Sequence, residues 1–239
     1  MATTEGALVL TYDLGAKLLR SSPIQVSTVK KAVHISPMFI TDDEDNRKLL
    51  HNFVIEQKDT IKAIAESDSS HTTLLDIDEK PLGDMVLLRF QYDTCDAHGL
   101  NMINNATFKA CLHIKKHTGI KFHHRSHYSG VKHHSPLNEE IGYGYHLRAS
   151  VTIPASALRL LRVTADILHD FFHRCLTSAN HAGIRAMNVH AVNGLTAIFL
   201  ACGQDIADIS MCRVCKDSCS INDDGSLHCF NNFSARSAS

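Results

Sequence analysis

The pattern of apolar and polar residues divides the chain into helical and extended stretches of ordinary length. Residues 1–20 place apolar side chains at largely helical spacing, and residues 25–40 are typical of extended chain. The acidic run at residues 42–45 is typical of the solvated first turn of a helix that continues to about residue 64. Strands are predicted over residues 71–78 and 85–92, a helix over 97–116 and a short strand over 119–122.

The order strand, helix, strand, strand, helix, strand between residues 24 and 122 predicts a ferredoxin-like unit. A polar loop follows over residues 125–145, then a strand over 147–153 and an amphipathic helix that begins at Pro154. The pattern fades after Asp205, and residues 231–239 are predicted to form a loose tail. We therefore predict an α+β fold. Residues 22–125 would form a small unit inserted into a larger unit made of residues 1–21 and 126–239.

The stretch from Ala186 to Asp205 is the most apolar part of the chain. Its second half is apolar on all sides, which is typical of a buried helix, and Gly203 stands where such a helix would end. Three polar side chains interrupt it: His190, Asn193 and Asp205. Because a buried polar group is unfavourable without a partner, each of them requires either a structural partner or a ligand.

Composition narrows the class of protein. A net charge of -1 gives no electrostatic footprint for nucleic acid or an anionic membrane surface. No apolar run approaches the length of a membrane span, and the N-terminus lacks a signal-peptide pattern. The eight Cys residues are scattered through a chain too long to depend on disulfides, which favours reduced thiols. We expect a cytoplasmic protein with no nucleic-acid or membrane partner.

Three segments resemble motifs of one enzyme family in the same order. They are Met1-Ala2-Thr3-Thr4-Glu5-Gly6, Asp96-Ala97-His98-Gly99-Leu100-Asn101-Met102, and Asn188-x-His190-Ala191-x-Asn193 running into Thr196-Ala197-Ile198-Phe199-Leu200-Ala201-Cys202-Gly203-Gln204-Asp205. These resemble motifs of class I 3-hydroxy-3-methylglutaryl-CoA reductases, and ordered matches are more specific than a single short motif. The resemblance covers roughly residues 1 to 210. It implies a large domain with a central helix and an inserted small cofactor domain.

The resemblance also implies catalytic residues. The family reduces a thioester in two hydride steps from NADPH, using a glutamate, a lysine and an aspartate in the reacting centre. Glu5 and Asp205 match the glutamate and the aspartate within their motifs. Counting back from Gly142-x-Gly144 and from Val151-x-Ile153-Pro154 places Lys132 on the lysine position. Such a trio is suited to proton transfer and to stabilising an oxyanion, because neighbouring charges shift one another's pKa. A buried ion-pair network without catalytic use is the alternative interpretation.

Further positions follow from the same resemblance. His190 and Asn193 would line the substrate cavity from the central helix, and His173 occupies the position of a family lysine. The cofactor motif keeps three of its residues: Asp96, Gly99 and Asn101.

Several departures argue against hydride chemistry. The family's Asp-Lys-Lys-Pro becomes Val131-Lys132-His133-His134, and the loop at residues 69–74 offers no permanent cation to the NADPH phosphates. Cys95 and His98 replace a glycine and a methionine, and no residue after Asp205 matches the family's catalytic histidine. Losing two or three charge-assisted hydrogen bonds of about 1.5–3 kcal/mol each would weaken NADPH binding by orders of magnitude.

Metal binding is a further hypothesis. His113 and His117 lie four residues apart on a predicted helix, and more histidines follow up to His134. Near the C-terminus, Cys212-x-x-Cys215-x-x-x-Cys219 and His228-Cys229 offer a thiol-rich alternative. Neither set has the usual spacing of a zinc site, so we predict exposed histidines, free thiols and no metal ligands.

Three functions remain at this point. The departures favour a non-redox biosynthetic enzyme of the cyclase type, which would use the inherited cavity, Glu5, Lys132 and Asp205 on a small-molecule substrate without a cofactor. The alternatives are an NADPH-dependent hydroxymethylglutaryl-CoA reductase, completed across a homodimer, and a non-catalytic relic.

Overall fold

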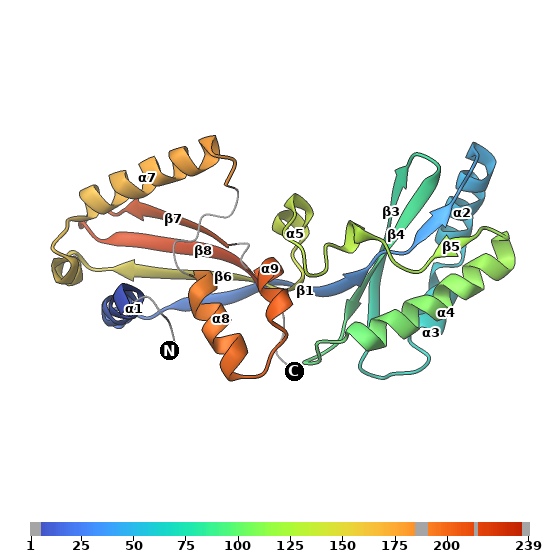
Figure 1. Ribbon diagram of the computed structural model, residues 1–239, viewed down its shortest axis with the longest axis horizontal. Helices are drawn as coiled ribbons and strands as arrows, with labels where there is room; N and C mark the ends of the chain where they lie inside the picture. Colours follow the sequence, from blue (N-terminus) through green and yellow to red (C-terminus); the bar gives the residue numbers. More distant parts are fainter. Residues whose placement is uncertain (1–5, 185–190, 213–214, 236–239) are drawn as a thin grey trace. The chain divides into compact units, whose positions relative to one another are not determined.

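The computed structural model describes residues 6–184, 191–212 and 215–235, with the backbone alone for 232–235. These residues divide into two compact units (Figure 1). Unit 1 contains the described residues up to Lys30 and those from Lys132 to Ala235. Unit 2 runs from Lys31 to Val131, so it lies in sequence between two segments of unit 1. None of the helices in the described part of the chain has the length and apolar character needed to cross a membrane.

Unit 2 is an antiparallel sheet with helices. Strand β4 (Met85–Asp93) pairs along one edge with β3 (Thr73–Leu82). Along its other edge, β4 pairs first with the end of β1 (Gln25–Ile35) and then with β2 (Met38–Ile40), and β2 also pairs with β5 (Phe122–His123). The helices are α2 (Glu44–Glu56), α3 (Lys58–Ala65) and α4 (Leu100–Thr118), and a short turn, η1 (His127–Ser129), follows β5.

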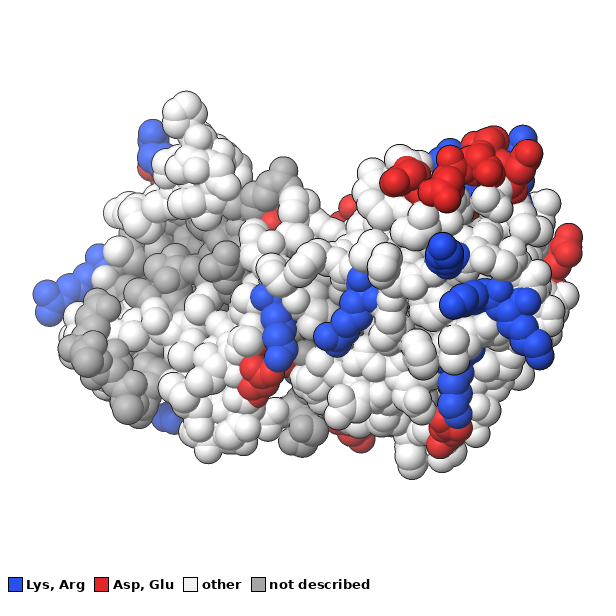
Figure 2. Space-filling view, turned by 45° about the vertical axis from the view of Figure 1, so that its right-hand side comes forward, with Lys and Arg blue, Asp and Glu red and all other residues white. Residues whose placement is uncertain are grey.

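The core of unit 2 lies between β4 and the three helices, which contact one another. Leu88, Phe90 and Tyr92 alternate along β4 and are fully buried, as expected for one face of a strand. Tyr92 Oη lies 2.8 Å from Thr107 Oγ1 of α4, which satisfies a buried hydroxyl and joins the helix to the sheet. At the start of α2, the Asn46 amide donates to the carboxylate of the N-cap residue Asp43, and Figure 2 shows acidic side chains gathered at this end of unit 2.

Unit 1 has a second antiparallel arrangement. Strand β8 (Leu227–Ala235) lies between β6 (Gly144–Ile153) and β7 (Cys215–Ile221), and β1 is the next neighbour of β6. The helical elements are α1 (Gly6–Leu19), α5 (Pro136–Ile141), α6 (Ala155–Leu158), η2 (Arg159–Leu161), α7 (Ala165–His181), α8 (Ala191–Ala201), η3 (Ile206–Asp208) and α9 (Ile209–Cys212). Its core joins residues from α1, β6, α6, α7 and β8: Leu18, Val151, Ile153, Leu158, Ala165 and Leu227.

Two sequence expectations about the C-terminal region were wrong. The region after Asp205 in fact contains η3, α9 and the hairpin β7–β8. Residues 231–235 of the expected tail belong to β8, which pairs with β6, and residues 236–239 lie outside the described residues. The inward positions of the hairpin carry Cys and Asp instead of large apolar residues, so the alternation of a strand was not visible. The sequence does contain one signal of a β-hairpin, the turn Asp224-Gly225, in which Gly225 has a φ of 74°.

The expected central buried helix was also wrong in its burial. Helix α8 forms within the expected stretch, but none of its described residues is buried, and Leu200 is 60% exposed. An apolar composition indicates that a helix packs against another segment, but it does not indicate which segment that is. In the described part of the chain, α8 contacts η3 and α9, and the Gly194 amide donates to Tyr12 Oη of α1 at 2.8 Å. The helix predicted from Pro154 is likewise divided into α6, η2 and α7, with Arg162 at φ 55° in the break.

Candidate functional site

Unit 1 brings together two residues that the sequence singled out. Lys132 Nζ donates a hydrogen bond to Asp205 Oδ2 across 73 positions of the chain, and the two groups form an ion pair. The side chains are 38% and 44% exposed, so both groups remain accessible to a ligand. An ion pair exposed to this degree contributes little to stability, typically about 0–1 kcal/mol. The pair is therefore not needed to hold the fold together.

The backbone at Lys132 is held in an unusual conformation. Its φ is 60°, in the left-handed region that costs a non-glycine residue about 1–2 kcal/mol. The following loop is fixed by Asn138, whose side-chain amide donates to the His133 carbonyl at 2.8 Å and is itself almost fully buried. The strain is thus maintained next to a residue with a candidate catalytic role, as strained backbone often is. No local sequence pattern marks Asn138 as a positioning residue.

Asp205 is oriented by its own backbone neighbours. Its Oδ1 accepts a hydrogen bond from the Ala207 amide at 3.0 Å, which makes Asp205 the N-cap of η3. Its Oδ2 accepts from Lys132. Because each oxygen has a separate donor, the carboxylate is fixed in one orientation, and it holds the lysine ammonium at a defined point. A fixed ammonium of this kind can stabilise negative charge that develops on a substrate oxygen.

The remaining predicted site residues of unit 1 are Glu5, His173, His190 and Asn193. Glu5 and His190 lie outside the described residues. Asn193 is exposed on α8 and His173 is exposed on α7. Within the part of the chain that the structure describes, neither side chain is hydrogen-bonded to Lys132 or Asp205. Their proposed contacts with substrate stay predictions.

The cofactor motif of unit 2 forms a tight loop ahead of α4. Asp93 Oδ1 accepts from the Cys95 amide at 2.9 Å, and Lys31 lies 3.3 Å from the same carboxylate oxygen. Thr94 Oγ1 donates to the Ala97 carbonyl at 2.8 Å. Cys95, which stands where the family has glycine, adopts φ 53°, so the chain keeps the left-handed turn without the residue that favours it.

Gly99 is the residue of this motif that the fold requires most. Its φ is 74°, and a Cβ placed on it would lie 2.4 Å from Thr94 Cγ2. It is the N-cap of α4 and provides no side-chain cap, so the first-turn amides of this 19-residue helix keep their donor capacity. Amides at a helix N-terminus are suited to bind a diphosphate. Asp96 and Asn101 lie exposed on either side of Gly99 in the sequence.

A lysine of α4 contacts the residue that precedes the loop at residues 69–74. Lys109 Nζ and Asn105 Nδ2 both donate to Asp68 Oδ2, immediately before that loop. The hydrogen bond from Lys109 lowers the pKa of the Asp68 carboxyl, so this carboxylate is held in its charged form. The structure thus supplies a lysine near the loop, although the loop residues themselves carry no permanent cation.

Three of the histidines considered as metal ligands pack against aromatic rings. The rings of His113 and His117 lie 4.3 Å apart, and both lie within 6 Å of the ring of Phe53. His124 packs edge-on against Phe108. Within residues 6–184, 191–212 and 215–235, no group of three or more His, Cys, Asp or Glu side chains is arranged to hold a metal ion. This applies to the described part of both sets considered above.

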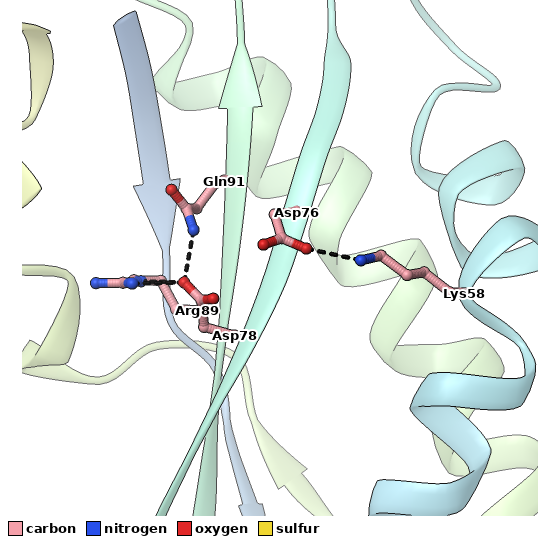
Figure 3. Close-up of polar contacts among 5 residues, drawn as sticks. All are labelled: Lys58, Asp76, Asp78, Arg89 and Gln91. Atoms are coloured by element: carbon pink, nitrogen blue, oxygen red, sulfur yellow. Dashed lines mark hydrogen bonds and ion pairs between the residues drawn. The ribbon is translucent and has the colours of Figure 1, made fainter. Parts of the chain in front are cut away.

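A polar network on strands β3 and β4 stabilises unit 2 (Figure 3). Asp78 Oδ2 accepts from Arg89 Nε at 3.0 Å and from Gln91 Nε2 at 2.5 Å. Asp76, two residues earlier on β3, turns instead toward Lys58 of α3, whose Nζ lies 2.7 Å from Asp76 Oδ1. The Arg89 side chain is only 12% exposed, whereas that of Lys58 is 54% exposed. The two ion pairs therefore differ in how strongly water screens them.

The substitution Asp78→Asn should lower the free energy of unfolding by about 1–3 kcal/mol, because it leaves a largely buried guanidinium without its counter-charge. The matched substitution Asp76→Asn removes an exposed pair and should cost less than about 1 kcal/mol. Urea denaturation of both variants tests this. An effect of Asp76→Asn as large as that of Asp78→Asn would contradict the assignment.

Comparisons with known proteins follow the motifs. The family model described as "Hydroxymethylglutaryl-coenzyme A reductase" matches residues 1–232. The 3-hydroxy-3-methylglutaryl-coenzyme A reductase of Halobacterium salinarum is 32% identical over 213 residues, covering 87% of this chain and 53% of that protein. The enzyme of the same name from Methanocaldococcus jannaschii is 30% identical over 237 residues, covering 94% of this chain and 58% of that protein. The chain thus spans about half the length of the curated relatives it matches.

A solved structure shows the same fold. The class II 3-hydroxy-3-methylglutaryl-CoA reductase from Streptococcus pneumoniae, bound to NADPH in open conformations, matches with a TM-score of 0.69 at 14% identity. The match covers 97% of this chain and 66% of that one. At this identity the likeness concerns the fold alone, a mixed α and β architecture with antiparallel sheets.

The expectation of a non-redox cyclase was wrong. The relatives that match most of this chain are named reductases, and the solved relative is bound to NADPH. The expectation gave too much weight to single substitutions around Lys132 and in the loop at residues 69–74. The structure shows Lys132 in contact with Asp205, and Lys109 of α4 in contact with Asp68 next to that loop.

The resemblance of three short motifs is confirmed over nearly the whole chain. The family model covers residues 1–232, and relatives of that name share 30% identity or more with it. The chain therefore belongs to the hydroxymethylglutaryl-coenzyme A reductase family.

Proposed function

We propose that this chain carries catalytic groups of an NADPH-dependent hydroxymethylglutaryl-CoA reductase. The observation that carries the proposal is the contact between Lys132 and Asp205, two residues far apart in the sequence that the family resemblance implies for the reacting centre. The strained backbone at Lys132 and the buried amide of Asn138 beside it support the same assignment. The names of the relatives support the substrate class.

The proposed roles of Lys132 and Asp205 depend on the charge that develops on the substrate during reduction. When a thioester or aldehyde carbonyl is reduced, negative charge develops on its oxygen, and a fixed cation next to that oxygen lowers the barrier. Lys132 Nζ would donate to this oxygen and pass it a proton, while Asp205 keeps the ammonium in place. NADPH supplies the hydride when it is bound. Glu5 would complete the trio as the resemblance implies.

We further propose that unit 2 is a ferredoxin-like cofactor unit. The antiparallel order β3, β4, β1 with β2, then β5, together with α2, α3 and α4 between the strands, supports this assignment. The α4 N-terminus at Gly99 would bind the diphosphate, because its amides are uncapped by side chains. Asp96 and Asn101 would hydrogen-bond the neighbouring parts of the dinucleotide, as the resemblance implies.

The test is a direct assay of the purified chain. NADPH absorbance is followed with and without hydroxymethylglutaryl-CoA, and NADPH binding is measured separately by fluorescence titration. We expect consumption that depends on the acyl-CoA, at about 1 per second or faster. Absence of both NADPH binding and turnover would refute the proposal. Light scattering on the same sample measures whether the expected homodimer forms.

A further inference from the structure

The hairpin β7–β8 places two thiols directly opposite each other. Cys219 of β7 and Cys229 of β8 are register partners. Next to the hairpin turn, the backbone amide of Asn222 donates to the backbone carbonyl of Ser226 at 2.9 Å. Hydrogen-bonded and non-hydrogen-bonded pairs alternate along an antiparallel ladder, so counting back from this bond makes Cys219 and Cys229 a non-hydrogen-bonded pair. Such pairs bring the two Cα atoms to about 4.5 Å and their side chains closest together.

This geometry is suited to a covalent link. A disulfide needs Cα atoms about 4.4–6.8 Å apart, and it needs both Cβ atoms on the same face of the sheet. Directly opposite residues of two paired strands share a face. Both thiols are also partly buried against the same core, which includes Val151 and Leu227. Burial, and then the neighbouring Cys219, raises the pKa of Cys229 to about 11, which is consistent with two adjacent sulfur atoms.

Four of the other cysteines lie in different surroundings. Cys215 is opposite Phe233 in the same hairpin, and Cys111 is buried in unit 2. Cys95 and Cys202 are exposed. They are therefore the natural reference thiols for ordinary surface reactivity.

We propose that Cys219 and Cys229 are a site of reversible oxidation, at which a hydroperoxide converts two thiols into one cross-strand disulfide. One thiolate attacks the peroxide oxygen, which forms a sulfenic acid and releases the first water or alcohol. The second thiol attacks the sulfenic sulfur, which forms the S–S bond and releases water. The two sulfur atoms lose two electrons in total, and the peroxide gains them. A dithiol reductant reverses the bond by exchange.

Closing the loop from residue 219 to residue 229 restricts the unfolded chain. β8 also pairs with β6 and contacts α9, so the link would join the edge strand β7 to a strand that is paired on both sides. The entropy of a loop of this length corresponds to a rise in Tm of about 5–10 °C for a protein of this size.

The experiment uses the full reduced chain. It is treated with hydrogen peroxide at about pH 9, where buried thiols are more often ionised, and the remaining thiols are alkylated. Digestion without reduction by a protease that cuts before Asp223 and Asp224 separates the two cysteines unless they are linked. We expect a Cys219–Cys229 cross-linked peptide that dithiothreitol removes. The gain in Tm should be absent in Cys219→Ser and Cys229→Ser, and it should persist in Cys95→Ser and Cys202→Ser.

The proposal is overturned if both thiols are recovered alkylated after peroxide treatment. It is also overturned if either sulfur is found linked to another cysteine or carried on to sulfinic acid. Should a serine variant fail to fold, the peptide map of the unsubstituted chain still decides the question.

Discussion

Lys132→Met should lower kcat for acyl-CoA-dependent NADPH oxidation by about 10²–10³-fold, the usual effect of removing one preorganised donor to a developing oxyanion. Methionine keeps the length and apolar stem of lysine but removes the ammonium that Asp205 holds. KM for the acyl-CoA should change much less, because the charge on the oxygen develops mainly in the transition state. Stability should change by about 1 kcal/mol or less, since the pair is half exposed.

Lys58→Met is the matched control for this variant. It removes another lysine from an ion pair with an aspartate, at 2.7 Å and similar exposure, from a helix of unit 2. We expect its kcat to stay within about twofold of the unsubstituted chain, because a surface pair of this kind contributes little. Equal losses in the two variants, or full activity of Lys132→Met, would show that Lys132 is not the group that stabilises the oxyanion.

Gly99→Ala should weaken NADPH binding by at least about tenfold. Alanine at φ 74° costs about 1–2 kcal/mol in backbone energy, and its Cβ would lie 2.4 Å from Thr94 Cγ2. The loop must shift to relieve this contact, and the shift displaces the first-turn amides of α4 that would bind the diphosphate. Fluorescence titration of NADPH measures the effect, because each tenfold change in Kd corresponds to about 1.4 kcal/mol.

The control variant Gly119→Ala separates the effect of the steric clash with Thr94 from the effect of backbone strain. Gly119 is the C-cap of the same helix, has the same φ of 74° and has no atom within 4 Å of an added Cβ. It should lower the stability of the fold by about 1–2 kcal/mol and leave NADPH affinity unchanged. If both variants bound NADPH as tightly as the unsubstituted chain, the α4 N-terminus would not be the diphosphate site.

Most elements of unit 2 could be predicted from the pattern, although the single helix expected up to about residue 64 is divided into α2 and α3 at Gln57. Leu88, Phe90 and Tyr92 alternate along one face of β4 and are fully buried. The hairpin of unit 1 could not be found in the same way. Its inward positions are Cys215, Asp217 and Cys219, and the Asp217 carboxyl is kept there by a hydrogen bond from Asn231, a partner across the strands that no local pattern contains.

In the candidate site, too, some residues could be predicted from the sequence and others could not. Lys132 and Asp205 were selected by family resemblance, and the structure shows their side chains in contact. Asn138 could not be identified, because its importance depends on a hydrogen bond to the carbonyl of His133, and a carbonyl has no sequence signature. The segments that contact α8 could not be predicted either, because the composition of an apolar helix does not specify its packing partners.

Lys132 is the first residue of unit 1 after the inserted segment, which ends at Val131. The segment that leads from unit 2 back to unit 1 must have one particular length for Lys132 to adopt its left-handed backbone and to contact Asp205. Deletions and insertions in the return connection should therefore be rare among active homologues. The tight turn at Gly83, where an added side chain meets no atom, should tolerate such length variation far better.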